Sequence, residues 1–388
     1  MKIVIAPDSF KESLSALQVA AAIEAGMREV WPDADYVKLP VADGGEGTVQ
    51  AMIDATGGRL VEHAVTGPLG EPVDAFYGLI EGDKEGALAV IEMAAASGLE
   101  SVPPARRNPM LATSRGTGEL IRLALDAGAR RFVLGVGGSA TNDGGAGMLQ
   151  ALGVRLLDAT GKEIGPGGGE LARLDRIDIA GLDARVGTSE FQIACDVANP
   201  LVGPQGASAI FGPQKGATPE MVARLDANLR HYADIIKRDL GQVVADMPGA
   251  GAGGGIAAAM VVFLKGRLRP GVEIVVDAVG LDAAVLDADL VVTGEGRIDG
   301  QTVQGKTPMG VARVARAHGK PVIGIGGSLA ADADAVYEHG IEAVFAAVRR
   351  PCSLDEALAA GFDNLRQAAR NVAAALRLGG QLGGQLRR

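Results

Sequence analysis

Alternation of strand, loop and helix patterns at both ends of the chain is the feature that most constrains its fold. Residues 2–6 form a β-branched run that predicts a buried strand, and residues 15–30 have the periodicity of a helix. Residues 36–40 and 49–55 repeat this order of strand and helix. Strands that alternate with helices in this way predict a parallel sheet with helices on its faces.

The same rhythm returns near the carboxyl terminus. Strands are predicted there over residues 289–293, 321–325 and 343–348, and helices over residues 308–318 and 354–376. Between the two ends, residues 58–90 alternate in short segments that indicate an antiparallel or mixed sheet. Residues 117–127 predict a helix, and residues 131–136 predict the strand that follows it.

The economical interpretation of this pattern is an α/β protein with two domains. Residues 1–57 and 286–378 would form one doubly wound, Rossmann-like domain from both chain ends. Residues 58–285 would form a second, mixed α/β domain that is inserted between them. Residues 379–388 repeat a short Gly-Gly-Gln-Leu unit and are expected to be a disordered tail.

Composition argues against several classes of function. The formal net charge is −10 and only 3% of the residues are aromatic, whereas nucleic-acid binding needs a basic surface. Cys195 and Cys352 lack the spacing of a disulfide framework or a zinc site. The longest apolar stretch, residues 256–264, is about half the length that a bilayer crossing needs. We therefore expect a cytoplasmic protein that binds neither nucleic acid nor membranes.

The segment over residues 294–310 contains the spacing G-x-x-x-x-G-K-[ST], which ends on Lys306 and Thr307. This spacing is typical of a loop that wraps phosphates with backbone N–H groups and one lysine. In a P-loop protein the first glycine directly follows a strand, but here the predicted strand ends several residues before Gly300. Pro308 also favours a helix that begins at that position and not at the lysine. We therefore predict that Lys306 contacts phosphate, but not within a P-loop fold.

Polar side chains follow the predicted strands at the point where each strand ends. In open parallel sheets, ligands bind beyond the carboxyl ends of the strands, so these side chains are expected to share one rim. They are Asp8, Ser9 and Lys11 after the first strand, Asp43 and Glu46 after the second, Glu295 and Asp299 after residues 289–293, and Gly326-Gly327-Ser328 after residues 321–325.

Each of these groups also has a purely structural explanation. Ser13 or Ser15 could cap the first helix, but Lys11 is mildly unfavourable near a helix N-terminus, and an anionic substrate would resolve that conflict. Asp43 and Glu46 could bind magnesium or act as a base, or they could form a capping box. Both interpretations of Asp43 and Glu46 stay open at this point.

A glycine-rich loop over residues 137–145 follows the strand predicted at residues 131–136. Its backbone N–H groups and hydroxyls could cradle phosphates at the start of a helix. The candidates within it are Gly137, Gly138, Ser139, Thr141 and Asn142. A plain flexible loop rarely needs so many glycines beside Ser, Thr, Asn and Asp, so we favour the functional interpretation. Asp196, directly after another apolar run, is a candidate base or metal ligand.

Taken together, these motifs resemble the bacterial type-1 glycerate kinases. The resemblance rests on residues 6–14, 43–48, 137–145, 293–299 and 305–308, and it runs in order to about residue 376. It implies a Rossmann-like domain from both chain ends, an inserted domain, and ATP-dependent phosphorylation of D-glycerate with Mg²⁺. The usual product in this family is 2-phosphoglycerate, although many members carry a 3-phosphoglycerate label, and the 3-position is kept as the alternative.

A kinase needs a phosphate cradle, a divalent metal, charge neutralisation and a positioned hydroxyl. For the activity that the resemblance implies, roles are inferred from residue chemistry. We expect Asp196 to be the base, Lys306 and Lys11 to neutralise charge, Asp8, Ser9, Asp43 and Glu46 to bind substrate, Glu295 and Asp299 to bind metal, and Gly137, Gly138, Ser139, Thr141 and Asn142 to bind the nucleotide phosphates. A cleft between the domains would close to exclude water.

The enzyme is expected to act on a small molecule, as a monomer or homodimer. A rival from another class is a non-catalytic binding protein for an acidic sugar metabolite, which would need the glycine loops but not the carboxylates. A dinucleotide-dependent oxidoreductase lacks support, because no G-x-G-x-x-G follows the first strand.

Overall fold

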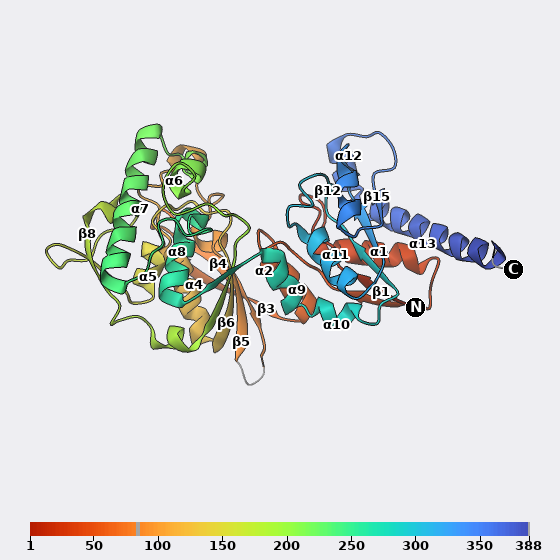
Figure 1. Ribbon diagram of the computed structural model, residues 1–388, viewed down its shortest axis with the longest axis horizontal. Coiled ribbons are helices and arrows are strands. Elements are labelled where there is room, and N and C mark those ends of the chain that lie inside the picture. Colours follow the sequence, from red (N-terminus) through yellow and green to blue (C-terminus); the bar gives the residue numbers. More distant parts are fainter. Residues whose placement is uncertain (83–85, 387–388) are drawn as a thin grey trace. The chain divides into compact units, whose positions relative to one another are not determined.

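The computed structural model describes residues 1–82 and 86–386 and divides the chain into two compact units (Figure 1). The first unit comprises Met1–Asp43, Gln50–Gly57 and Val272–Arg388, and the second comprises Gly44–Val49 and Gly58–Gly271. The first unit is therefore built from both chain ends. Its boundary lies at Val272, whereas the strand pattern placed it after residue 285. The reason is packing, because Val272 packs closely against Gly310 of the first unit. A Cβ added at Gly310 would lie 2.2 Å from the Val272 side chain.

A five-stranded parallel sheet forms the centre of the first unit. Its strand order is β15-β13-β11-β1-β2. The strands are β1 (Lys2–Ile5), β2 (Asp35–Lys38), β11 (Leu290–Thr293), β13 (Val322–Gly326) and β15 (Ala343–Ala346). The chain runs outward from β1 to β2, and later outward from β11 to β15 on the other side. The switch point of this doubly wound sheet therefore lies between β1 and β11.

Helices α1 (Ala16–Arg28) and α13 (Gly361–Leu386) cover one face of this sheet. Successive residues of a strand point to opposite faces, and Ile3 and Ile5 pack into one buried cluster with Ile23 of α1 and Leu365 of α13. Helix α11 (Thr307–Ala317) also packs against β11 and β13, and its buried side chains lie outside that cluster. Ser15 begins α1 with a capping box that it shares with Gln18, as one of the two expected caps.

Two differences from the sequence analysis concern the carboxyl-terminal helix. The expected single helix is broken at Ala360 into α12 (Leu354–Ala359) and α13. Ser13, from the other end of the chain, donates its hydroxyl to the carbonyl of Leu358 at 2.7 Å and lies where a side chain at Gly361 would sit. The described part of the expected disordered tail, residues 379–386, continues α13 as helix. Residues 387–388 of that tail lie outside the described residues.

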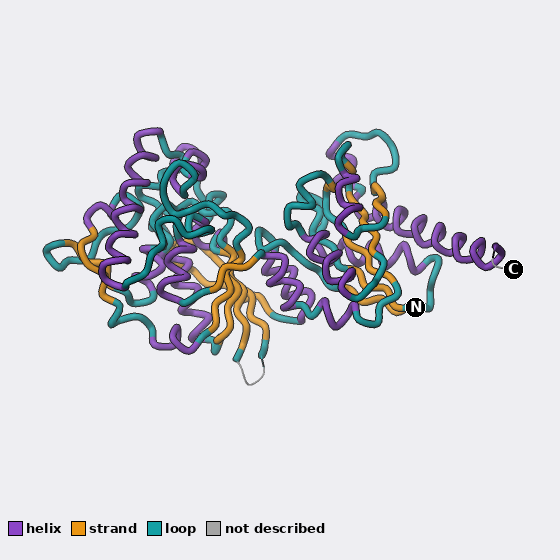
Figure 2. Tube along the Cα trace, in the orientation of Figure 1, coloured by secondary structure: helices purple, strands orange, loops and turns teal. Residues whose placement is uncertain are grey.

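The second unit is built on a six-stranded mixed sheet of order β10-β9-β6-β5-β4-β3 (Figure 2). Its strands are β3 (Arg59–Thr66), β4 (Pro72–Ile80), β5 (Ala87–Glu92), β6 (Ala129–Gly135), β9 (Glu190–Ala194) and β10 (Arg267–Arg269). The pairs β3–β4 and β4–β5 are antiparallel, and the remaining pairs are parallel. The mixed sheet expected from residues 58–90 is thus present.

Most of the remaining helices belong to the core of the second unit. They include α4 (Arg115–Asp126), α5 (Ala146–Ala151), α7 (Pro219–Leu240) and α8 (Ile256–Leu264), which bury side chains in one cluster with the sheet. The remaining short α-helices and strands come from both units. They are α2 (Thr48–Thr56), α3 (Ala94–Ser97), α6 (Ala207–Phe211), α9 (Gly271–Ala278), α10 (Leu281–Val285), β7 (Arg155–Asp158), β8 (Leu174–Asp178), β12 (Arg297–Ile298) and β14 (Ser328–Leu329).

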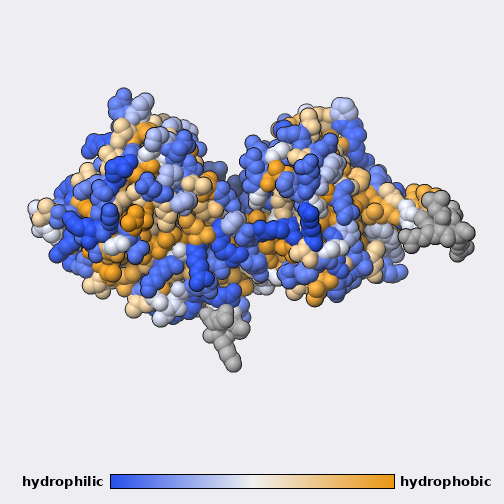
Figure 3. Space-filling view, in the orientation of Figure 1, coloured by the Kyte–Doolittle hydropathy of each residue, from blue (hydrophilic) through white to orange (hydrophobic). Residues whose placement is uncertain are grey.

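The predicted fold class is confirmed, including the absence of a P-loop in the segment around Lys306. The small strand β12 lies between β11 and α11, and Lys306 is the N-cap of α11, with Pro308 in its first turn. A P-loop would run directly from the strand into the helix. Within the described residues, no helix combines the length and the apolar character that a membrane crossing requires. The face drawn in Figure 3 mixes hydrophilic residues with scattered hydrophobic ones.

Candidate active site

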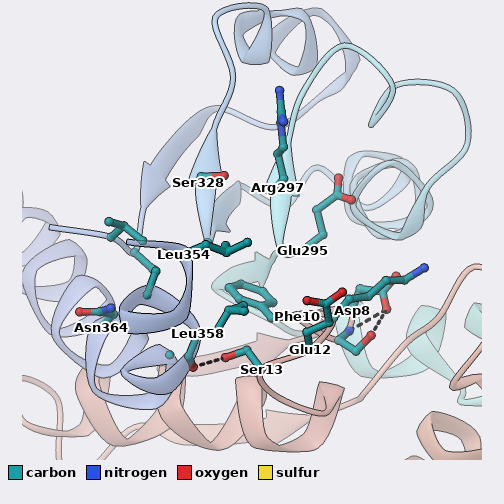
Figure 4. A pocket seen from close by; sticks show the side chains of 18 of the residues that line it. Asp8, Phe10, Glu12, Ser13, Glu295, Arg297, Ser328, Leu354, Leu358 and Asn364 are labelled. Carbon is teal, nitrogen blue, oxygen red and sulfur yellow. Dashed lines mark hydrogen bonds between the residues drawn. The ribbon is translucent and has the colours of Figure 1, made fainter. Parts of the chain in front are cut away.

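A pocket of about 560 Å³ lies in the first unit, at the carboxyl ends of β1, β11 and β13 (Figure 4). Loops that are far apart in sequence meet there because the ends of parallel strands share one edge of the sheet. The backbone N–H of Asp8, after β1, donates to the carbonyl of Gly294, after β11, at 2.8 Å. The pocket therefore sits at the switch point of the sheet, where open α/β sheets bind their ligands.

Asp8 is held by hydrogen bonds to both of its carboxylate oxygens. The backbone N–H of Ser9 donates to Oδ1 at 2.6 Å, and the hydroxyl of Thr307, at the start of α11, donates to Oδ2. Burial raises the pKa of Asp8 to about 6, against the opposing effect of the Thr307 hydrogen bond, and the nearby carboxylates of Asp43 and Glu295 raise it further. Asp8 is therefore a fixed carboxyl group whose charge changes close to physiological pH.

Lys306 lies beside two carboxylates that follow β11. Its Nζ is 3.3 Å from Oε2 of Glu295 and 3.8 Å from Oδ1 of Asp299. Thr302 donates its hydroxyl to Oε1 of Glu295 at 2.6 Å. Burial nevertheless raises the pKa of Glu295, although Thr302 and Lys306 both oppose that shift. Arg297 extends away from Asp8 in Figure 4, with two thirds of its side chain exposed.

Seven of the predicted site residues line this one pocket. They are Asp8, Ser9, Lys11, Asp43, Glu295, Asp299 and Lys306, and Gly327 and Ser328 from the loop after β13 lie beside them. With Glu12, which also lines the pocket, five carboxylates share one concave surface with two lysines. Such a surface suits a ligand that carries both phosphates and a divalent cation.

Glu46 does not line this pocket. It is exposed, in the short segment Gly44–Val49 that belongs to the second unit. The capping role left open for Asp43 and Glu46 is filled by Glu92, at the end of β5. Its Oε1 accepts the N–H of Val49 at 2.8 Å, and its carboxylate also accepts from the N–H groups of Gly47 and Thr48. Burial raises the pKa of Glu92 in spite of these bonds.

The glycine-rich loop after β6 is largely internal. Gly137 and Gly138 are exposed, but Ser139, Thr141 and Asn142 are buried. Two of these residues are held by a buried lysine that the sequence pattern did not single out, and the Asn142 amide donates to the hydroxyl of Ser208 at 2.9 Å. The Nζ of Lys215 donates to Oγ of Ser139 and to the carbonyl of Thr141, both at 2.7 Å. In this conformation, the backbone at Gly137 and Gly138 is the part of the loop open to a ligand.

Asp143 holds the other end of the same loop. It is fully buried and accepts the backbone N–H and the hydroxyl of Ser114 at 2.9 and 2.8 Å, and the N–H groups of Gly145 and Gly147. Burial raises its pKa, and burial lowers the pKa of Lys215 to about 7. Lys215 and Asp143 therefore fix this loop from inside the second unit.

Asp196 follows β9, which pairs with β6, and β6 in turn pairs with β5 in the second sheet. Glu92, the glycine-rich loop and Asp196 thus follow the carboxyl ends of three neighbouring parallel strands. The Asp196 side chain is exposed and its Oδ1 accepts the N–H of Gly271 at 3.0 Å. Exposure leaves its carboxylate able to reach a ligand, as a base or metal ligand must.

Two signals in the sequence could have pointed to the missed residues. Glu92 is the lone charge in the apolar run over residues 87–96, and a charge in a buried strand is rare unless it is paired. Lys215 stands between glycine and proline residues, in Gly212-Pro-Gln-Lys-Gly216, where the chain turns closely. Neither signal names a partner, because the groups that bind these side chains are far away in the sequence.

A doubly wound sheet with lysines and carboxylates at its switch point defines an α/β protein of the class that handles small phosphorylated ligands. The chain matches the model of the Glycerate kinase family over residues 3–377, and it belongs to that family. The predicted family and the predicted enzyme class, a phosphotransferase with an alcohol acceptor, are thereby confirmed. This class implies ATP as the phosphate donor.

Named relatives agree with this membership. The chain is 59% identical to glycerate 2-kinase of Escherichia coli K12 over 98% of its own length and 99% of that protein. It is 58% identical to glycerate kinase of Bacillus subtilis 168, over 97% and 98% of the two chains. A crystal structure from Salmonella typhimurium LT2, provisionally assigned as glycerate kinase 2, matches with a TM-score of 0.91 at 60% identity and covers 98% of this chain and 99% of its own.

Proposed function

We propose that the protein transfers a phosphoryl group from ATP to the 2-hydroxyl of D-glycerate and releases 2-phosphoglycerate and ADP. Family membership supports the kinase reaction, and the name of the Escherichia coli relative supports the 2-position. The chemical support for the proposal is the group of lysines and carboxylates at the switch point of the first sheet.

The lysines would neutralise negative charge. Phosphoryl transfer requires little covalent chemistry from the protein, so positioning and electrostatic stabilisation dominate its catalysis. Lys306 and Lys11 line the pocket and would face the transferring phosphate or the glycerate carboxylate. Asp8, Ser9 and Asp43 would bind the hydroxyl groups of the acceptor.

Magnesium fits the carboxylates of this pocket only with help from the nucleotide. Among the described residues, no three His, Cys, Asp or Glu side chains are grouped so as to hold a metal ion by themselves. In kinase sites, however, Mg²⁺ is commonly held by one or two carboxylates together with substrate phosphates and water. We propose Glu295 and Asp299 for that task, because both are oxygen donors that share Lys306. The ion would neutralise charge on the phosphates.

The second unit would contribute the remaining groups. We propose Asp196 as the base that accepts the hydroxyl proton, since its carboxylate is exposed at the end of β9. The phosphates would be bound by Gly137 and Gly138 of the glycine-rich loop, with Ser139, Thr141 and Asn142 behind them. Glu46, exposed on its short segment, is kept as a substrate-binding residue in this proposal.

The reaction is tested with purified protein, ATP, Mg²⁺ and D-glycerate. ADP should appear only when glycerate is present, and EDTA should abolish its formation. Product identity follows from coupling to enolase without phosphoglycerate mutase, because only 2-phosphoglycerate feeds enolase directly. Signal that requires added mutase would favour the 3-position. ADP formation that does not depend on glycerate would contradict the proposed reaction, and binding of glycerate without turnover would favour a binding protein.

The proposed setting is the cytoplasm, with the enzyme as a monomer or homodimer. The net charge of −10 and a pocket of small-molecule size in the first unit agree with an enzyme that acts on a small molecule in this setting. Light scattering of the purified protein during size-exclusion chromatography distinguishes one copy from two, and a larger assembly would contradict this proposal.

A further inference from the structure

The pocket at the switch point has an apolar half that the proposed acceptor does not need. Its polar half consists of the lysines and carboxylates after β1 and β11. Its other half is lined by Phe10, Ala347, Val348, Leu354, Ala357 and Leu358. D-glycerate carries a carboxylate and two hydroxyls on three carbons, so it has almost no apolar surface to bury. A pocket of about 560 Å³ is instead in the size range that holds a cofactor or a drug-sized ligand.

The apolar half is firmly built. Helix α12 forms its wall and begins with a capping box between Ser353 and Glu356. The hydroxyl of Ser13 donates to the carbonyl of Leu358 at 2.7 Å, which ties the end of α12 to the loop after β1 (Figure 4). That same loop carries Asp8 and Lys11 of the polar half. The two halves therefore belong to one continuous, preformed surface.

Leu354 has no place in the hydrophobic core. Its side chain is 69% exposed at the first position of α12 and lines the pocket. Phe10, in contrast, is only 5% exposed and lines the same region. An exposed leucine alone needs no explanation, but one that lines a polar-rimmed pocket together with a buried aromatic residue suits a flat apolar ligand group.

We propose that the apolar half of this pocket holds the adenine and ribose of ATP, with the triphosphate directed toward Lys11 and Lys306. This inference rests on the proposed kinase function, which supplies ATP as the occupant. ATP matches both halves of the pocket, because its flat base suits the apolar half and its polyanionic triphosphate suits the lysines of the polar half. Adenosine binding is thereby assigned to the first unit, in which all of the residues that line this pocket lie.

Ala357→Trp tests this assignment, because it fills the apolar half from α12. Ala359→Trp is the matched control, since Ala359 is exposed on the same helix and does not line the pocket. Ala357→Trp should raise KM for ATP at least tenfold and weaken binding of a fluorescent ADP analogue similarly. KM for D-glycerate should stay within about twofold, and Ala359→Trp should leave all three quantities unchanged.

A second pair keeps the test open if a tryptophan disturbs α12. Leu354→Asp places a negative charge beside the base site at an exposed position, and Leu286→Asp makes the same change at a leucine that is 63% exposed outside the pocket. Leu354→Asp should raise KM for ATP severalfold, and Leu286→Asp should not. Circular dichroism establishes that each variant is folded.

The outcomes separate this inference from the proposed function. Wild-type protein without glycerate-dependent ADP formation would overturn the function itself. If the wild type is active, unchanged ATP affinity in folded Ala357→Trp and Leu354→Asp overturns the adenosine site alone. A rise in KM for D-glycerate with unchanged KM for ATP would instead assign the apolar half to the acceptor, which also overturns the inference.

Discussion

At the scale of single residues, Asp8 makes activity and stability respond to pH in opposite directions. Its pKa is raised to about 6, chiefly by burial, so its folded form binds a proton more tightly than the unfolded chain does. The stability contribution of Asp8 is therefore greatest at acid pH and is lost as pH rises from about 4 through 6. Its carboxylate, which would accept hydrogen bonds from the substrate hydroxyls, forms in the folded protein as pH rises through about 6.

Asp8→Asn should therefore lower kcat/KM for D-glycerate at pH 7.5, measured with magnesium. It should also raise the melting temperature, measured without added magnesium. The wild-type profile of kcat/KM should fall as pH drops through about 6, because that profile reports groups of the free enzyme. Asp33→Asn, at an exposed position outside the pocket, is the control. A melting temperature lowered by Asp8→Asn at neutral pH would contradict this account of the carboxyl group.

Lys215 gives a second residue-scale prediction, on stability alone. Burial lowers its pKa to about 7, so between pH 7 and its ordinary value near 10.5 the unfolded chain holds a proton that the folded protein lacks. Its contribution to the free energy of unfolding therefore rises with pH across that window, by up to about 1.4 kcal/mol per pH unit.

Lys215→Met should remove this pH dependence. In urea unfolding, the free energy of unfolding of the wild type minus that of the variant should be larger at pH 9 than at pH 7. Lys237→Met, at an exposed position on α7, should change stability equally at both pH values. A difference between wild type and Lys215→Met that is the same at pH 7 and pH 9 would contradict burial of a titrating lysine.

At the scale of elements, the contact between α1 and α13 depends on a glycine. A Cβ added at Gly26 would lie 1.9 Å from the carbonyl oxygen of Arg366 on α13. Gly26→Ala should therefore destabilise the protein by up to about 2 kcal/mol, because an overpacking cost of about 1–3 kcal/mol outweighs the gain of about 1 kcal/mol in helix propensity. Gly380→Ala, on α13 with nothing within 4 Å of the added Cβ, should be neutral or slightly stabilising. Equal effects in chemical denaturation would contradict the close packing of these helices.

Local pattern predicted most elements but not their interruptions. The strands and helices of both chain ends follow from apolar periodicity, which is a property of neighbouring residues. The break at Ala360 was missed because Ser13, hundreds of positions away, takes the carbonyl of Leu358. Repeated glycines likewise suggested disorder after residue 378, although helix α13 continues there.

The candidate site divides in the same way. Asp8, Glu295 and Lys306 could be predicted to share one rim because polar loops after parallel strands meet at one edge of the sheet. Glu92 and Lys215 could not, since their roles depend on backbone groups supplied by distant segments. The loop after β6 was predicted as an open phosphate cradle, and the sequence could not reveal that Lys215 binds the Ser139 hydroxyl and the Thr141 carbonyl from inside the unit.

At the scale of the whole molecule, we propose that the two units are separate domains that divide the reaction between them. The first would hold ATP, magnesium and the acceptor at its switch point, and the second would supply Asp196 and the glycine-rich loop. Both chain ends are needed to complete the first sheet, because residues 3–5 of β1 pair with residues 290–292 of β11. Loss of either chain end should therefore abolish activity.

The most direct test of the account is the rate of ADP formation from ATP and D-glycerate by wild type and Lys306→Ala. Lys306 is both the lysine of the G-x-x-x-x-G-K-[ST] spacing and the ion-pair partner of Glu295 and Asp299. The wild type should turn over only with D-glycerate. Lys306→Ala should lose about 10²–10³-fold in kcat, the usual cost of losing one charge-stabilising group, while Lys320→Ala, outside the pocket, should not. A folded Lys306→Ala variant with nearly wild-type kcat would contradict the placement of catalysis at this switch point.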